Sequence, residues 1–213
     1  MRAALLDAPH PAVSAPLDGD GRRSAVLAAL HPGRLAASGD GSAAGAEAHI
    51  VLTRRAAHLR QHAGEVSFPG GRQEPGEDLW RTALRESTEE VALDPVDVTR
   101  LGELDHLRTV TSESFIVPFV AELPEWPELR PHPGEVEAVL HVPLSELLDP
   151  EAYREERWTM RGQERSMWFF DIDGDTIWGA TASMLRNLLT IVTGTFDVAD
   201  RQPPWSFPPP TAG

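Results

Sequence analysis

The chain has 213 residues, with 33 acidic and 19 basic side chains and a formal net charge of −14. This length predicts one domain with a sizeable core, and the absence of cysteine excludes disulfides, thiolate metal sites and a cysteine nucleophile. The acidic balance argues against binding to nucleic acid or an anionic membrane, and no run approaches the roughly 18 apolar residues of a membrane span. Since the N-terminal segment also lacks the pattern of a secretory signal, we expect a cytoplasmic protein.

The N-terminal quarter of the chain predicts an arm followed by two strands. Residues 1–22 are interrupted by prolines and predict a flexible arm with one short helix at residues 3–6. Residues 24–30 form an apolar run that predicts a buried strand. Residues 31–47 are rich in Gly, Ala and Ser and predict a mobile loop. Residues 48–53 alternate weakly and predict the strand that leads into an arginine-rich segment.

The centre of the chain predicts an amphipathic helix with an acidic face. Asp78 is a plausible N-cap, and small or apolar residues follow at helical spacing. These residues are Trp80, Ala83, Leu84, Ser87 and Val91. Glu86, Glu89 and Glu90 then fall on one face, where like charges repel by about 0.2–0.5 kcal/mol per exposed pair. Arg85 can pair with Glu89 one turn away.

Two interpretations fit this acidic face. The simpler one is a solvated surface, which is usual for a charge cluster. The alternative is a site for a hard divalent cation, which takes oxygen ligands and would remove the repulsion. His58 and His62, four residues apart, are a weaker candidate for a metal pair, because no carboxylate within their segment completes the site.

The segment after this helix predicts strands and one short helix. Residues 98–107 and 114–121 predict strands, and Pro118 predicts that the second lies at a sheet edge or a bulge. Residues 144–153 predict a short helix and residues 158–167 a polar hairpin.

The C-terminal part predicts a turn, a long helix and a tail. Asp173-Gly174 lies between two alternating runs and predicts a hairpin turn, since the spacing around it does not fit a calcium loop. Residues 180–192 carry an apolar stripe that predicts a core helix ended by Gly194, with a homodimer contact as the alternative. Residues 198–213 are rich in proline and predict a disordered tail.

The central motif resembles the Nudix box of the Nudix hydrolases. The resemblance is carried by Gly71, Glu77, Arg85-Glu86 and Glu89-Glu90 at the spacing of that box. Ser87 and Ala92 depart from it, where the family usually has an aliphatic residue and a glycine. The resemblance implies an α/β fold, a mixed-sheet α/β/α sandwich with a loop-helix-loop catalytic motif, which we expect over residues 23–197.

A second signature directly precedes the box and resembles that of coenzyme A diphosphatases. Its residues are Leu52-Thr53, Arg55-Ala56, Arg60, Gly64 and Phe68-Pro69-Gly70-Gly71. This resemblance implies a small-molecule substrate, with cleavage of coenzyme A or a thioester to 3′,5′-ADP and (acyl-)4′-phosphopantetheine. Arginine fits such a substrate because it binds phosphate groups bidentately. The substrate-binding candidates are Arg54, Arg55, Arg60 and Phe68.

The resemblance also implies a metal site and a catalytic group. The expected ligands of Mg²⁺ or Mn²⁺ are Glu86, Glu90, Glu89, Glu77 and the carbonyl of Gly70. Glu89 is the first candidate for the general base, followed by Glu86 and Glu135, and Arg85 belongs to the same catalytic group. Two alternatives stay open: a Nudix enzyme for ADP-ribose, NADH or a damaged nucleotide, and a non-catalytic nucleotide-binding module.

Overall fold

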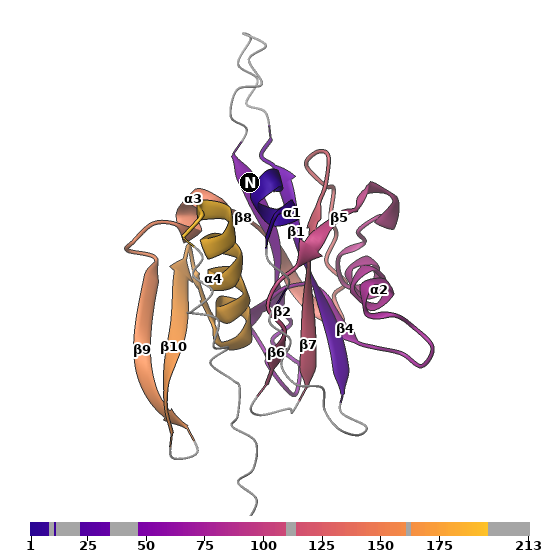
Figure 1. Cartoon of the computed structure of the whole chain (residues 1–213). Helices are drawn as coiled ribbons and strands as arrows, with labels where there is room; N and C mark the ends of the chain where they lie inside the picture. The colour runs from indigo at the N-terminus through magenta and orange to yellow at the C-terminus, as the bar shows by residue number, and fades with distance from the viewer. Residues whose placement is uncertain (9–10, 12–21, 35–46, 110–113, 161–162, 196–213) are drawn as a thin grey trace, which may run out of the picture.

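The structure is a computed structural model (Figure 1). It describes residues 1–8, 11, 22–34, 47–109, 114–160 and 163–195. The predicted tail and most of the predicted loop at residues 31–47 and of the predicted arm lie outside these ranges.

An eight-stranded mixed sheet forms the centre of the fold. Its central strand β1 (Arg23–Pro32) runs parallel to β7 (Phe115–Glu122) on one side. On its other side β1 pairs antiparallel with β2 (Ala48–Arg55) through one end and with β4 (Gly70–Arg72) through the other. β8 (Val136–Pro143) pairs with β2. The remaining strands of this sheet are β3 (Val66–Ser67), β5 (Thr99–Glu103) and β6 (Leu107–Arg108).

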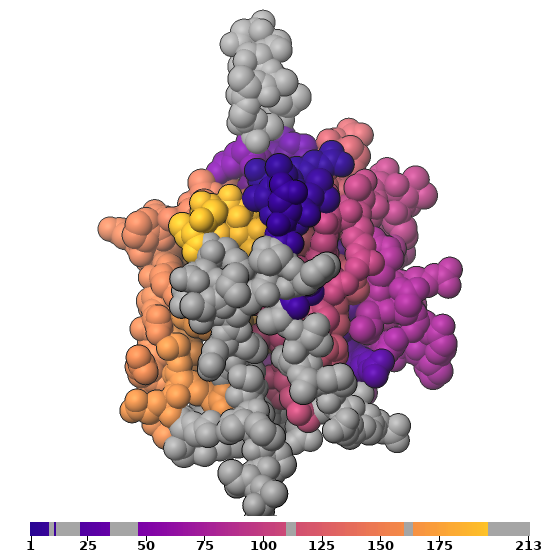
Figure 2. Space-filling model, in the orientation of Figure 1, coloured from indigo at the N-terminus to yellow at the C-terminus, as the bar shows by residue number. Residues whose placement is uncertain are grey.

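Helices cover both faces of the main sheet. Figure 1 shows α2 (Leu79–Val91) on one face and α4 (Gly179–Thr193) on the other. A second, three-stranded sheet lies beyond α4 and consists of β9 (Tyr153–Met160), β10 (Gln163–Ile172) and β11 (Asp175–Trp178). Figure 2 shows the β9–β10 hairpin along one edge of the molecule and the α2 region along the opposite edge. The predicted mixed α/β sandwich is confirmed, with the second sheet as an added layer.

Two hydrophobic clusters hold these layers together. One cluster lies between α2 and the main sheet and includes Leu27, Ala83 and Val91. The larger one joins the opposite face of that sheet to α4 and the second sheet, and includes Leu185 and Leu188. The short helices are α1 (Arg2–Leu6), η1 (Pro95–Asp97) and α3 (Leu144–Leu147). Among the described residues, no helix is long and apolar enough to span a membrane.

Several predicted elements are confirmed. The short helix in the arm is α1, and the predicted hairpin at residues 158–167 is the β9–β10 pair. Gly174 makes the next turn with a φ of +77°, and Gly194 ends α4 with a φ of +70°. Both conformations suit glycine because it has no Cβ.

Three predictions of secondary structure differ from the structure in part. Residues 98–107 form two strands, β5 and β6, because the segment between them leaves the ladder. The helix predicted at residues 144–153 ends at Leu147, and Tyr153 begins β9. Pro118 does not mark an edge, since β7 is paired on both sides. The carbonyl of Pro118 accepts from Leu104 N, so its ring nitrogen faces the break between β5 and β6, where no donor is required.

Candidate active site

Gly70 and Gly71 let strand β4 approach both the main sheet and helix α2. Gly70 has a φ of +152°, and a Cβ there would lie 2.3 Å from the carbonyl oxygen of Ala25. A Cβ on Gly71 would lie 2.5 Å from the carboxylate carbon of Glu86. Glycine is required at Gly70, because the atoms in the way belong to the backbone of β1. At Gly71 the carboxylate of Glu86 occupies the space that a Cβ would fill. The turn therefore presents bare backbone to the acidic face of α2.

Helix α2 is defined by local bonds at both ends. The predicted N-cap is confirmed, because the Asp78 carboxylate accepts from Arg81 N at 2.9 Å. The hydroxyl of Ser87 is buried and donates to the carbonyl of Ala83 at 2.7 Å, which satisfies it without an aliphatic side chain. The helix ends at Ala92, which adopts a left-handed conformation with a φ of +56°. Both departures from the Nudix box are therefore accommodated.

Arg85 connects the acidic residues of the site. Its Nε donates to Glu77 Oε1, its Nη2 lies beside Glu86 Oε1, and its Nη1 donates to Glu89 Oε2, each at 3.0 Å. Nη2 also donates to the carbonyl of Arg72 at 2.9 Å. The hydrogen bond from Arg85 holds the pKa of Glu77 below its usual range. One guanidinium thus fixes three carboxylates and the strand that faces them.

Glu86 and Glu90 both face the Gly70-Gly71 backbone. Glu90 is 3% exposed, and its Oε2 accepts from the amide of Gly70 at 3.1 Å. Burial raises the pKa of Glu90 to about 7, and the charges of Glu86 and Glu135 add to this effect. Burial likewise raises the pKa of Glu86, where Glu89 and Glu135 also contribute. The sequence-predicted carboxylates therefore lie close enough together to oppose one another's ionisation.

The chemistry of this group fits a divalent cation that keeps part of its water shell. Within the described ranges, no three His, Asp or Glu side chains form a ready coordination shell. Mg²⁺ typically binds proteins through one or two carboxylates and retains several waters. Glu86 and Glu90 supply two carboxylates beside the Gly70-Gly71 backbone, and burial raises the pKa of both because it disfavours the charged form. A cation there would favour the ionised form of both side chains.

Arg55 lies next to Glu90 with an unused donor. Its Nη1 is 3.8 Å from Glu90 Oε1, and in the described part of the chain its buried Nε has no hydrogen-bond partner. The backbone of Arg55 is held on both sides, since its N donates to the Glu65 carbonyl and its carbonyl accepts from Gly64 N. Gly64 makes this turn with a φ of +72°. The turn thus fixes the backbone of Arg55, whose cationic side chain lies beside Glu90.

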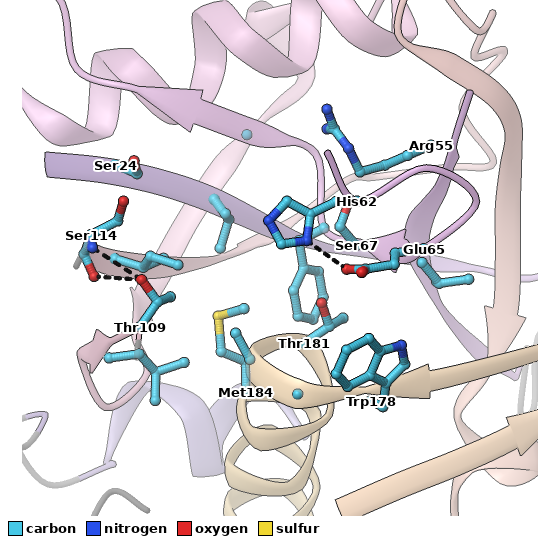
Figure 3. Close-up of a pocket in the computed structure, with 18 of the residues that line it drawn as sticks. Ser24, Arg55, His62, Glu65, Ser67, Thr109, Ser114, Trp178, Thr181 and Met184 are labelled. Carbon is cyan, nitrogen blue, oxygen red and sulfur yellow. Dashed lines mark hydrogen bonds and ion pairs between the residues drawn. The ribbon is translucent and has the colours of Figure 1, made fainter. Parts of the chain in front are cut away.

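A cavity of about 380 Å³ opens beside Arg55, between the main sheet and the layer of α4 and the second sheet. We call it the inter-sheet cavity. Figure 3 shows Arg55 on one side of it, with Trp178, Thr181 and Met184 across from Arg55. Gly70 and Gly71 also line it, and the same two residues face the glutamates of α2.

The other predicted substrate-binding residues occupy different places. Arg54 bonds Asp175 and lies 3.6 Å from Glu137. Arg60 is exposed in the turn after β2 and is not among the described residues that line the cavity. Phe68 is 2% exposed and forms part of the cavity floor.

Sequence patterns did not identify the far wall of the cavity. It is formed by Trp158, Met167, Trp178, Thr181 and Met184. Four of these lie in the segments predicted as a polar hairpin and a core helix. The sequence signal that could have indicated this wall is the pair of tryptophans, Trp158 and Trp178. The structure leaves their side chains 40% and 39% exposed, as a ligand-binding surface requires.

Comparison with known protein sequences assigns the chain to one family. A family model described as the NUDIX domain matches residues 42–162. A Photorhabdus laumondii subsp. laumondii protein named "Uncharacterized Nudix hydrolase NudL" is 39% identical over 140 residues, covering 65% of this chain and 74% of the relative. A protein of the same name from Salmonella paratyphi B is 37% identical over 140 residues, covering 65% and 72%.

Solved structures with this fold include a Nudix hydrolase from M. smegmatis, RenU, and a C. elegans Ap4A hydrolase. RenU gives a TM-score of 0.54 at 16% identity, covering 84% of this chain and 98% of that one. The Ap4A hydrolase gives 0.50 at 16% identity, covering 81% and 98%. These structures support the fold alone, whereas the family model and the sequence relatives establish membership. The chain therefore belongs to the Nudix family of hydrolases.

Proposed function

We propose that the protein hydrolyses the diphosphate bond of coenzyme A or its thioesters, giving 3′,5′-ADP and 4′-phosphopantetheine or its acylated form. The observation that carries this proposal is the juxtaposition of Glu86 and Glu90 with Arg55 across the Gly70-Gly71 backbone. Family membership supports hydrolysis. The choice of coenzyme A rests on the resemblance of residues 52–71 to the signature of coenzyme A diphosphatases.

Mg²⁺ or Mn²⁺ is the proposed cofactor. Glu86 and Glu90 would hold the ion, with Glu89 and the carbonyl of Gly70 as further oxygen donors. When bound, such an ion lowers the pKa of water and offsets negative charge on phosphoryl oxygens. Glu77 has both carboxylate oxygens bonded to Arg85, so we assign it to holding Arg85 in place, with contact to the ion through water.

Glu89 is the proposed general base. Its side chain is 59% exposed, and Arg85 fixes one of its oxygens at 3.0 Å. It would accept a proton from the attacking water while the water oxygen bonds to one phosphorus and the bond to the bridging oxygen breaks. Glu86 and Glu135 are the alternatives, because both lie in the same electrostatic cluster.

Arg55 is the proposed ligand of the diphosphate. Its buried Nε has no partner in the described part of the chain, and a phosphoryl oxygen would supply one. Arg60, exposed in the same turn, is proposed to contact a phosphate of the nucleotide. Arg54 is less suited to this role because Asp175 already binds it.

A substrate comparison tests the proposal. With millimolar Mg²⁺, we expect 3′,5′-ADP release from coenzyme A, with kcat/KM at least tenfold above that for ADP-ribose or NADH. EDTA should abolish the reaction. A preference for ADP-ribose or NADH would overturn the assigned substrate, and no metal-dependent cleavage of any of the three would overturn catalysis at this site.

A further inference from the structure

The inter-sheet cavity has an apolar lining that diphosphate cleavage does not require. Phe68, Met167 and Met184 in its walls are each at most 3% exposed. The indole rings of Trp158 and Trp178 line it as well, although they are 40% and 39% exposed. Single exposed apolar side chains are ordinary, but indoles continuous with buried thioethers form a surface suited to an apolar ligand. Thioethers also adapt to ligands of different shape.

The charges around the cavity favour a ligand that is uncharged beyond its phosphates. Arg55 stands at the end beside Glu90. His62 Nδ1 and Glu65 Oε2 lie 2.9 Å apart, so each side chain already has a polar partner. Among the described lining residues, Arg108 is the one other cationic side chain. An additional phosphate inside the cavity would therefore meet little positive charge.

Polar groups in the cavity are mainly hydroxyls. Ser24, Ser67 and Thr181 line it, and Figure 3 shows them around the space between the sheet and α4. Hydroxyls both donate and accept, so they can match amide N–H and C=O groups without adding charge. This combination of apolar walls and scattered hydroxyls suits a flexible chain that contains amides.

The cavity and the glutamate site share their boundary. Arg55, Gly70 and Gly71 line the cavity, and all three also contact the carboxylates of α2 or their immediate surroundings. A group bound in the cavity would thus lie next to a diphosphate held by Arg55 at this shared boundary.

We propose that the inter-sheet cavity binds the uncharged arm of the substrate, the pantetheine chain together with the acyl group on its sulfur. This inference rests on the proposed function and deepens it, because it makes thioesters with an apolar acyl chain the preferred substrates. Affinity should rise by up to roughly fourfold for each methylene buried. The nucleotide half would lie outside this cavity.

The two product halves test this arrangement separately. Calorimetry with the whole protein would measure binding of 4′-phosphopantetheine, its S-octanoyl form and 3′,5′-ADP. We expect the S-octanoyl form to bind at least tenfold more tightly than the free thiol. Trp178→Ala should weaken binding of the S-octanoyl form by about tenfold and leave 3′,5′-ADP binding within about twofold. Trp126→Ala is the matched control, because Trp126 packs on His31 at the other end of β1.

Each outcome bears on the inference separately from the proposed function. Equal affinity for the acylated and free arms, or loss of 3′,5′-ADP binding in Trp178→Ala, overturns the inference even if the wild type cleaves coenzyme A. An equal loss of affinity in Trp126→Ala overturns it too. If the wild type neither cleaves coenzyme A nor binds either half, the inference and the proposed function both fail. Circular dichroism of each variant establishes that it is folded.

Discussion

Arg54 and Asp175 join the two sheets of the protein through a bidentate ion pair. Nε donates to Oδ1 at 2.8 Å and Nη2 to Oδ2 at 2.5 Å, and the Asp175 side chain is 8% exposed. The hydrogen bond that Arg54 donates to Asp175 raises the pKa of Arg54. β2 and β11 belong to sheets that share no strand pairing, so this contact ties together the walls of the inter-sheet cavity.

The first prediction concerns the energy of this tie. Charge-assisted hydrogen bonds contribute about 1.5–3 kcal/mol, so we expect a coupling of that size between Arg54→Ala and Asp175→Ala in a double-mutant cycle of urea unfolding. The exposed pair of Arg34 and Glu128, both side chains at least 67% exposed, is the matched control. Its coupling should stay below about 1 kcal/mol. A coupling at Arg54–Asp175 no larger than at the control would show that the tie contributes little.

The second prediction is that Glu90→Gln changes stability and turnover in opposite directions. Burial raises the folded-state pKa of Glu90 to about 7, so above pH 7 the metal-free protein carries a costly buried charge. The pKa of Glu90 is near 4.5 in the unfolded state and near 7 in the folded state. The destabilisation therefore grows as pH rises from about 4.5 and is complete above about 7. At pH 8, Glu90→Gln should therefore be more stable by on the order of 2–3 kcal/mol.

Turnover of the same variant should fall at least 100-fold, because the amide binds a divalent cation poorly. Mg²⁺ should also raise the melting temperature of the wild type and not that of the variant. Glu122→Gln is a suitable control, since Glu122 pairs with Arg2 and lies outside both the α2 cluster and the inter-sheet cavity. Near-normal turnover in Glu90→Gln would remove Glu90 from the metal site.

Local patterns predicted the centre of the site well. Asp78, Ser87 and the spacing of Glu86 and Glu90 act within one helix, so their positions follow from its period. The Gly70-Gly71 turn could likewise be expected from its composition. The role of the turn is to leave room for the Glu86 carboxylate, whose carbon lies 2.5 Å from the place of a Cβ on Gly71. This role depends on helix α2, which packs against the turn.

Contacts between distant segments account for the rest. Arg54 was expected to bind phosphate, yet Asp175, 121 residues away, binds it. No periodicity in either segment encodes that pairing. Pro118 was expected at a sheet edge or a bulge, yet it lies in a strand that is paired on both sides. The strand accommodates proline because β5 and β6 are interrupted opposite it, and this interruption is not visible in the local sequence. The cavity combines β1, β3 and α4, so it requires the complete topology.

The third prediction is that acid destabilises the protein through His141. His141 Nδ1 lies 2.9 Å from His31 Nε2, while His31 Nδ1 donates to the Pro32 carbonyl, so His31 accepts from His141 and both rings are neutral. Trp126 stacks on His141 with ring centroids 4.3 Å apart. The pKa of His141 is lowered to about 4, chiefly by burial, with His31, His49 and Arg34 acting in the same direction.

The sign follows from proton linkage. The unfolded state binds a proton on His141 at a pKa near 6.5 and the folded state only near 4, so stability is complete above about pH 6.5 and falls progressively below it. His141→Phe keeps an aromatic ring beside Trp126 without the titrating group. The stability of the wild type relative to this variant should therefore decline between pH 7.5 and pH 4.5, because the opposing titration of Glu90 is common to both proteins. An identical pH dependence in that variant would assign the decline to other groups.

The fourth prediction concerns the end of helix α2. Ala92 has a φ of +56° and its amide bonds the carbonyls of Ser87 and Thr88. A left-handed conformation costs an L-residue roughly 1–2 kcal/mol, and glycine avoids this cost. The greater conformational entropy of glycine in the unfolded state offsets part of the gain in stability. Ala92→Gly should therefore stabilise the protein by about 1 kcal/mol, measured by urea unfolding.

Ala92→Val is the matched control, because a β-branched residue tolerates positive φ least, and it should destabilise the protein by more than glycine stabilises it. The order Gly, Ala, Val would show that backbone strain at this position, and no side-chain contact, sets the stability difference. Because Ala92 lies two residues after Glu90, relief of the strain should leave metal binding intact if the carboxylates are fixed by Arg85 and the Gly70 amide. A loss of stability in Ala92→Gly would contradict the strained helix end.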